Sequence, residues 1–267
     1  MLMLAPDLLD RRALALIRLV DVFGRPVDGP VRIESPGVTS VAKGPGEHAI
    51  LSAPGFEAHV GAFETPPATP AAGSKAIPLD LTALARRVLP RRFSLLLPRD
   101  PDPAHRLQPD SLFQAAAIEM LPSPRALLAG SACAIRVTVR RKDDKKLVEH
   151  ALVRARSDNG LFTARALTDA RGEACLIFPV LPLSFAGGGA TVLPDLPGKV
   201  VADVDPAVAA FHSPADLGAA AEAAEARTTG HPDPDALTAS LSPDFGSGLP
   251  LRFAAGRQIP VTIEWEP

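Results

Sequence analysis

The stretch from Val137 to Phe178 decides the fold of this chain, and it reads VTVRRKDDKKLVEHALVRARSDNGLFTARALTDARGEACLIF. Short apolar runs alternate in it with turn signals, namely the charged segment 141–146, the Asn159-Gly160 pair and the segment 169–172. Each run has the length of a β-strand, and strands that recur at such short intervals are typical of a β-sandwich. The sequence therefore predicts an all-β fold with antiparallel strands.

Residues on either side extend this pattern into a second domain over residues 128–267. Apolar residues alternate with polar or small ones from Cys133 to Arg140, as in a strand with one buried face. A helix is predicted within an insertion at 206–248, because Ser213 can cap it, Pro214 suits its first position and Gly230 can end it. We expect the insertion to be dispensable for folding.

A shorter version of the strand pattern precedes the stretch and predicts a first sandwich over residues 11–98. The segment 17–20 can be aligned with 135–138, and the segment 46–51 with 172–177, which predicts two related domains in tandem. Residues 1–10 are expected to form an N-terminal arm. Residues 99–127, rich in proline and aspartate in their first part, are expected to form an exposed linker.

Several motifs of the first half resemble the carboxypeptidase regulatory-like, or transthyretin-like, domain. They are the Gly-Arg-Pro-Val-Asp-Gly turn at 24–29, the strand that begins at Gly46, and the Ala-Pro-Gly-Phe turn at 53–56. The Thr-Asp-x-x-Gly turn at 168–172 is similar to one that this family shares with bacterial immunoglobulin-like domains. The resemblance covers about 85 residues of the first half and about 50 of the second, a full domain and part of another. It implies a non-catalytic sandwich and transfers no active-site residue.

Composition excludes several classes of function. A net charge of -2 over 267 residues argues against a nucleic-acid partner, which would need a basic excess. The chain has one Trp and no Tyr, so a surface of stacking aromatic residues for sugars is poorly supplied. The apolar run at Met1–Asp7 is too short for a signal sequence, and no segment has the length of a membrane span. We expect synthesis in the cytoplasm.

The sequence offers few candidate catalytic or metal-binding side chains. Cys133 and Cys175 lie in apolar runs, so we expect two free and unreactive thiols. The histidines lack the paired spacing of a zinc site, and His48 and His59 are expected on the surface. Aspartates alternate with prolines in two loops, which favours extended solvated segments over calcium sites; these are Asp100, Asp102, Asp110, Asp233, Asp235 and Asp244. We expect no catalytic residue, no cofactor and no metal.

The interpretation that follows is a structural or adaptor protein that contacts protein partners in a larger assembly. The segment 118–124 resembles accessory proteins of phage-tail-like contractile injection systems, which implies a released or membrane-docked particle. Two alternatives stay open, a sandwich that binds carbohydrate or calcium, and a hydrolase with an unrecognised site. The candidate partner-binding residues lie in or beside the insertion and are Phe211, Leu217, Leu237 and Phe245.

Overall fold

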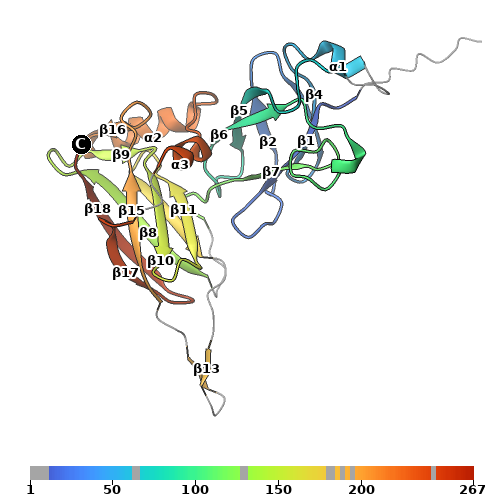
Figure 1. The fold of residues 1–267 in the computed structure, drawn as a ribbon. Coiled ribbons are helices and arrows are strands. Elements are labelled where there is room, and N and C mark those ends of the chain that lie inside the picture. Colours follow the sequence, from blue (N-terminus) through green and yellow to red (C-terminus); the bar gives the residue numbers. More distant parts are fainter. Residues whose placement is uncertain are drawn as a thin grey trace, which may run out of the picture.

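The structure is a computed structural model, and it describes residues 12–61, 67–126, 132–178, 184–186, 190–192, 196–241 and 245–267. Two β-sandwich units follow one another along the chain (Figure 1). The predicted all-β fold with antiparallel sheets and a short helical part is confirmed. The predicted arm, residues 1–10, lies outside the described residues.

The first unit packs a four-stranded sheet against a three-stranded one. The first sheet has the order β3-β4-β1-β7, with bounds Thr39–Gly44, Glu47–Ser52, Ala15–Val20 and Ala116–Glu119. The second has the order β2-β5-β6, with bounds Val31–Glu34, Lys75–Ala83 and Arg91–Leu97. Buried side chains of both sheets form one core, which includes Ile17, Ile50, Leu81 and Ile118.

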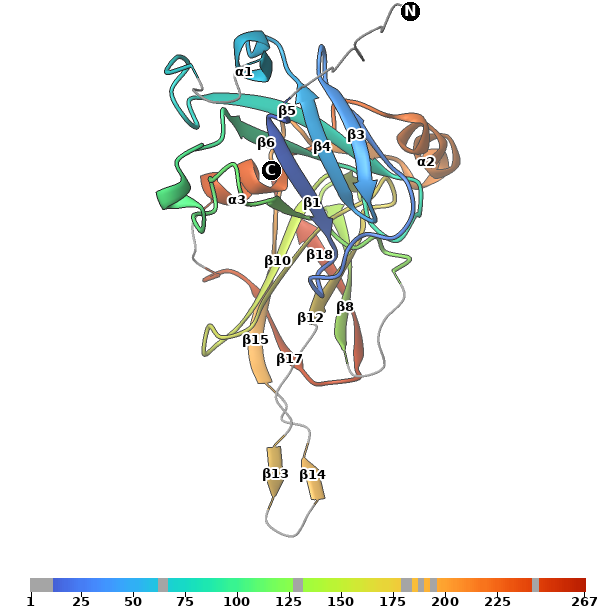
Figure 2. The ribbon, with the colours of Figure 1, turned by 90° about the vertical axis from the view of Figure 1, so that its right-hand side faces the viewer.

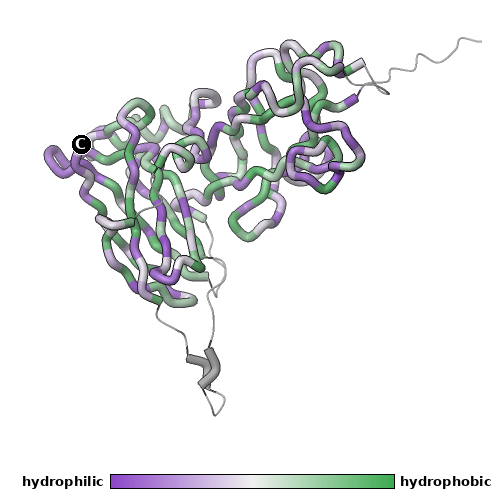
Figure 3. The backbone as a smooth tube through the Cα atoms, viewed as in Figure 1, coloured by the Kyte–Doolittle hydropathy of each residue, from purple (hydrophilic) through white to green (hydrophobic). Residues whose placement is uncertain are grey.

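The second unit has a five-stranded and a four-stranded sheet. The five-stranded sheet has the order β12 (Glu173–Phe178), β8 (Cys133–Arg141), β9 (Leu147–Glu149) and β16 (Ala210–His212). Its fifth strand, β18 (Gln258–Trp265), pairs with β8. The four-stranded sheet has the order β11-β10-β15-β17, with bounds Thr163–Leu167, Leu152–Ser157, Leu196–Asp203 and Leu249–Phe253. Its core includes Val137, Val153, Leu176 and Phe253. Figure 3 shows both polar and apolar segments along the strands of this unit. Burial alternates along β8 and β10, as strands with one buried face require, whereas β12 is apolar and buried from Ala174 to Phe178.

The remaining elements are short. The helical elements are α1 (Glu57–Gly61), η1 (Pro103–His105), η2 (Pro214–Asp216), α2 (Leu217–Ala226) and α3 (Pro234–Ser240). Strands β13 (Ser184–Ala186) and β14 (Ala190–Val192) form a hairpin, and Figure 2 shows that this hairpin extends from the second unit. The predicted insertion helix is present as η2 and α2, and Ser213 caps it by accepting from the N–H of Ala215. The helix ends at Ala226 and not at Gly230, because the backbone of Arg227 is already extended.

Both units use the same pairing around their first strand. In the first unit β1 is antiparallel to β4 and parallel to β7. In the second β8 is antiparallel to β12 and parallel to β18. The backbone N–H of Leu19 donates to Gly46 at 2.7 Å, and that of Val139 donates to Gly172 at 2.8 Å. Leu19 in the first unit is therefore equivalent to Val139 in the second. The predicted alignment of 17–20 with 135–138 is wrong by two residues, because it makes Leu19 equivalent to Val137. A shift of two keeps every side chain on its face, so alternation alone could not fix the register.

One strand departs from the repeat. In the first unit β3 pairs with β4, whereas in the second unit the corresponding β11 pairs with β10 and so belongs to the other sheet. This change makes β11 an edge strand of the sheet that contains β10, β15 and β17.

The predicted linker is much shorter in the structure. Strand β7, at 116–119, pairs with β1, and Met120 is buried in the first core. The segment 99–115 is a loop of the first unit that is closed at its base, because Arg99 donates to the carbonyl groups of Pro109 and Ser111. The covalent connection between the two units is formed by the residues between Met120 and the start of β8.

Apolar contacts join the units on two sides. Val22 and Phe23, in the turn after β1, pack on a cluster of the second unit that includes Cys175 and Ile177. Leu89 and Leu121 meet residues from three parts of the second unit, namely Leu152, Leu167, Leu237 and Leu241. The two sandwiches therefore share a packed interface instead of being joined by an exposed hinge.

The segment 206–248 is part of this architecture. Strand β16 within it pairs with β9, and α3 packs near β6 and β10. The expectation that the segment is dispensable for folding is wrong, because its removal would take away a strand and part of the interface.

Candidate functional site between the two sandwiches

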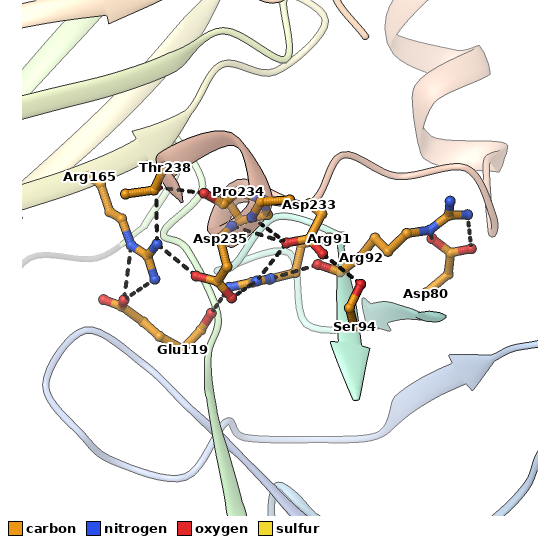
Figure 4. A network of polar contacts seen from close by, with 11 residues as sticks. Asp80, Arg91, Arg92, Ser94, Glu119, Arg165, Asp233, Pro234, Asp235 and Thr238 are labelled. Atoms are coloured by element: carbon orange, nitrogen blue, oxygen red, sulfur yellow. Dashed lines mark hydrogen bonds and ion pairs between the residues drawn. The ribbon is translucent and has the colours of Figure 1, made fainter. Parts of the chain in front are cut away.

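Arg91, at the start of β6, is the centre of a polar network between the units (Figure 4). Its side chain is 1% exposed. The guanidinium donates to the backbone carbonyl of Glu119 at 2.7 Å and to that of Arg92 at 3.2 Å, and it forms an ion pair with Asp235 of α3. A buried cation requires such partners, because burial alone strongly disfavours charge.

The second unit supplies another cation to the same carboxylate. Arg165 of β11 contacts Asp235 with 2.7 Å between Nη1 and Oδ1, and it contacts Glu119 of β7 with 3.0 Å between Nη2 and Oε2. Charges of opposite sign therefore alternate from Arg91 to Asp235, Arg165 and Glu119. Arg91 and Glu119 belong to the first unit, and the other two belong to the second.

The capped N-terminus of α3 positions Asp235. Asp233 caps α3 by accepting from the backbone N–H groups of Asp235 and Ala236, and Pro234 occupies the first turn. Asp233 also accepts from the hydroxyl of Ser94 in the first unit, at 3.1 Å. The Asp-Pro-Asp motif was predicted to be an extended solvated loop, and this prediction is wrong, because the motif starts a helix that faces a buried arginine. Asp244 lies outside the described residues.

The charges in the network shift one another's pKa values. Burial lowers the pKa of Arg91, while Asp235 and Asp233 oppose this effect. Burial would raise the pKa of Asp235, but Arg91 and Arg165 outweigh it and lower that pKa. The carboxylate is therefore charged at neutral pH and matches the two arginines.

A second contact region lies beside the first. The carboxylate of Asp80 on β5 contacts Arg92 with 2.8 Å between Nη2 and Oδ2, and it accepts from the backbone N–H groups of Gly230 and His231, each at 3.2 Å. Burial would raise the pKa of Asp80, but Arg92 and these N–H groups lower it. The loop before α3 is thus tied by its backbone to the first unit.

Glu149, at the end of β9, forms a third polar centre and is 3% exposed. Its carboxylate contacts Nε2 of His212 at 2.8 Å, Nη1 of Arg227 at 3.1 Å and Nε2 of His150 at 3.2 Å. Burial would raise the pKa of Glu149, but His150, His212 and Arg227 lower it to about 2. Because Arg227 follows α2 directly, this carboxylate fixes the end of that helix.

His231 lies between the Asp80 and Glu149 regions. Its Nε2 is 3.3 Å from the hydroxyl of Thr82 on β5, and burial lowers its pKa. A cavity of about 540 Å³ is lined by His150, Arg227 and His231 together with Arg92. The arginines beside this cavity are both paired with carboxylates, so the polar groups satisfy one another.

Ion pairs and hydrogen bonds of this arrangement join the two units at several points. The carboxylates of Asp80, Glu149 and Asp235 are engaged by arginines and histidines, and these contacts tie the loop before α3, the end of α2 and the start of α3 in place. Over the described ranges, no group of three or more His, Cys, Asp or Glu side chains is arranged to hold a metal ion.

The residues predicted to bind a partner have contacts within the chain. Phe211 of β16 stacks on Trp265 with 5.8 Å between ring centroids, and Leu237 packs against the interface cluster. Phe245 is buried, with the guanidinium groups of Arg154 and Arg156 over its ring. Leu217, at the start of α2, is half-buried. The structure does not bring the four together as one exposed apolar patch.

Other site expectations have mixed outcomes. Cys133 and Cys175 are both free and buried, as predicted. His48 and His59 were expected on the surface, but both are buried. Sequence reasoning named Leu237, Asp233 and Asp235 without recognising the interface, and it missed Arg91, Arg165 and Glu119. The one available signal was the Asp-Pro-Asp motif, which could have been interpreted as a helix cap.

Comparisons with known proteins add little to this description. One structural match is the Bacillus anthracis TIE protein, with 8% sequence identity and a TM-score of 0.26. The match covers 94% of this chain and 33% of that one, so this chain spans about a third of the protein it matches. No protein-family model and no curated protein matches the sequence. Among the helices that the structure describes, none is long and apolar enough to cross a membrane.

Proposed function

We propose that this chain is a non-enzymatic structural protein that mediates protein–protein contacts in a larger assembly. The observation that supports it is the interface network in which Arg91, Asp235, Arg165 and Glu119 join two sandwich units. Domains within one chain are expected to move relative to each other unless their interface is substantial. Here an ion-pair network centred on the buried Arg91 and two apolar clusters all join the units, which favours a fixed relation between them.

A rigid pair of sandwiches is a suitable spacer or adaptor. It presents loops at defined positions, and its sheet edges offer backbone groups to which a partner strand can be added. The absence of an enzyme activity is part of the proposal. It is supported by the resemblance to a non-catalytic domain family and by the ion pairs that engage the carboxylates of Asp80, Glu149 and Asp235.

The finer proposal concerns the type of unit and the assembly. The parallel pairing of the first and last strands in each unit, together with the turn motifs, supports transthyretin-like or immunoglobulin-like sandwiches. We extend the proposal to phage-tail-like contractile particles on the resemblance of the segment 118–124 alone. In this proposal the chain is made in the cytoplasm and becomes part of a released or membrane-docked particle.

The test is cross-linking of the tagged chain in the organism that makes it, followed by sedimentation of the extract. We expect the chain to sediment with a large particle and its cross-links to map to loops. Asp235→Ala should reduce incorporation, because it weakens the fixed relation between the units. Glu222→Ala, on the exposed side of α2, is the matched control and should have no effect.

Contrary outcomes would separate the alternatives. A chain that sediments alone at its own 27.9 kDa and gives no cross-links would contradict the adaptor proposal. Heat evolved on titration with calcium or glycans would favour the ligand-binding alternative, and turnover in a broad screen of hydrolase substrates would favour the enzyme alternative.

A further inference from the structure

Helix α2 forms one wall of a cavity between the two units. The cavity has a volume of about 310 Å³, at the small end of the range for ligand pockets. We call it the α2 cleft, and its apolar lining comes from Leu84, Val88, Pro124, Ala170, Ala221 and Ala224. The first two residues belong to the first unit, Pro124 to the connector and the last three to the second unit.

The core of the second unit does not require α2. None of the residues of this helix is buried, although seven of its ten residues are apolar alanine or leucine. An ion pair of 2.9 Å joins Glu225 on the helix to Arg86 of the first unit, and both side chains are largely exposed. Exposed pairs contribute little to stability. The alanine face therefore serves mainly to line the cleft, where its small side chains leave space.

The lining of the cleft carries three arginines, Arg86, Arg125 and Arg171, and two carboxylates, Asp169 and Glu225, so positive groups are in excess by one. Arg125 and Arg171 line it, both residues are exposed, and neither has an ion-pair partner among the residues that the structure describes. The carboxylate of Asp169, which also lines the cleft, accepts from the backbone N–H groups of Arg171 and Glu173 and is held within its own turn, where the Arg171 charge acts on it. An apolar lining that also carries two exposed arginines, Arg125 and Arg171, is complementary to an apolar side chain flanked by carboxylates.

We propose that the α2 cleft binds a segment of a partner protein in which one aliphatic side chain lies between acidic residues. The aliphatic group enters between α2 and the first unit, and the carboxylates contact Arg125 and Arg171. This inference rests on the proposed adaptor function and names the chemistry of the partner segment.

The test uses a capped peptide with the sequence Gly-Glu-Leu-Glu-Gly and follows backbone amide signals of the full chain by NMR. We expect saturable shifts at Leu84, Ala170 and Ala224. Peptides with lysine in place of glutamate, or serine in place of leucine, should bind at least tenfold more weakly. Ala221→Trp fills the cleft, and the double variant Arg125→Glu with Arg171→Glu reverses the charge at these two positions, so each should weaken binding at least tenfold.

Ala223→Trp is the matched control, because it adds the same side chain to an exposed position of the same helix. It should bind the peptide as the natural chain does, and circular dichroism should show that both tryptophan variants are folded. The inference is overturned if the peptide gives no saturable shifts at millimolar concentration, or if Ala221→Trp and Ala223→Trp bind it equally. The assay contains no native assembly, so its failure is distinct from a failure of the adaptor proposal in the sedimentation test.

Discussion

Removal of the Asp235 carboxylate should weaken the contact between the two units more than an ordinary surface substitution would. In Asp235→Ala, Arg91 stays buried and retains two carbonyl acceptors, while its remaining carboxylate, that of Asp233, is 3.7 Å away. Leaving one member of a buried ion pair unpaired costs about 3–5 kcal/mol. Asp235 is 41% exposed, so water screens part of its interaction and the cost should be smaller.

We expect Asp235→Ala to lower the free energy of unfolding by about 2–3 kcal/mol, with the loss at Arg165 contributing about 0.5 kcal/mol of it. Urea unfolding can resolve the two units, because the only tryptophan, Trp265, lies in the second one and circular dichroism reports on both. The two signals should coincide in the natural chain. In the variant they should separate, since the units then stabilise each other less.

A double-mutant cycle with Arg91→Met isolates the buried charge. When the cation is absent, Asp235→Ala should cost less than about 1 kcal/mol, because no buried charge is left unpaired. Equal costs in the two backgrounds would refute the reasoning. So would a cost below about 0.5 kcal/mol in the natural chain, which is within the range of ordinary surface changes.

Three further predictions concern other parts of the chain. Gly46→Ala and Gly172→Ala should each lower the free energy of unfolding by more than about 1 kcal/mol, measured by thermal or urea unfolding. Both glycines have φ of +66°, and a new Cβ at either would lie 2.6 Å from a backbone oxygen. Gly73→Ala is the control and should cost less, because Gly73 has a similar φ of +69° but no atom within 4 Å of the new Cβ. The pKa of Glu149 falls from 4.5 to about 2 on folding, so the stability from this group is present above pH 4.5 and is lost as the pH falls toward 2. Glu149→Gln should remove up to about 2 kcal/mol of that dependence between pH 7 and pH 3, measured as urea midpoints. Burial raises the pKa of both Cys133 and Cys175, so mass spectrometry without reductant should find two thiols that a thiol reagent modifies only after unfolding.

Sequence patterns predicted the strands because each sandwich strand has one buried face. Alternation from Cys133 to Arg140 became β8, whose core-facing residues include Ile135 and Val137. The paired glycines at 46 and 172 revealed the repeat, because both lie where a strand approaches another backbone too closely for a side chain. Alternation does not distinguish registers that differ by two residues, and so the strand alignment was shifted.

The interface could not be predicted in the same way, because its contacts join residues far apart in the sequence. Arg91 and Asp235 are separated by 144 positions, and neither belongs to a motif that specifies the other. An Asp-Pro-Asp motif is compatible with both a solvated loop and a capped helix. The choice between them depends on a buried arginine that only the folded first unit provides.

The departure of β11 from the repeat accounts for the position of the interface. In the first unit the corresponding strand, β3, stays beside β4. In the second unit β11 pairs with β10 instead, at the edge of its sheet, with Arg165 opposite Arg154. From that edge Arg165 contacts Glu119, which belongs to the last strand of the first unit, and Asp235 of α3. A second unit with the pairing of the first would place this strand in the other sheet and would leave Asp235 without its second cation, Arg165. The strand exchange, together with α3, therefore turns two similar sandwiches into a joined pair.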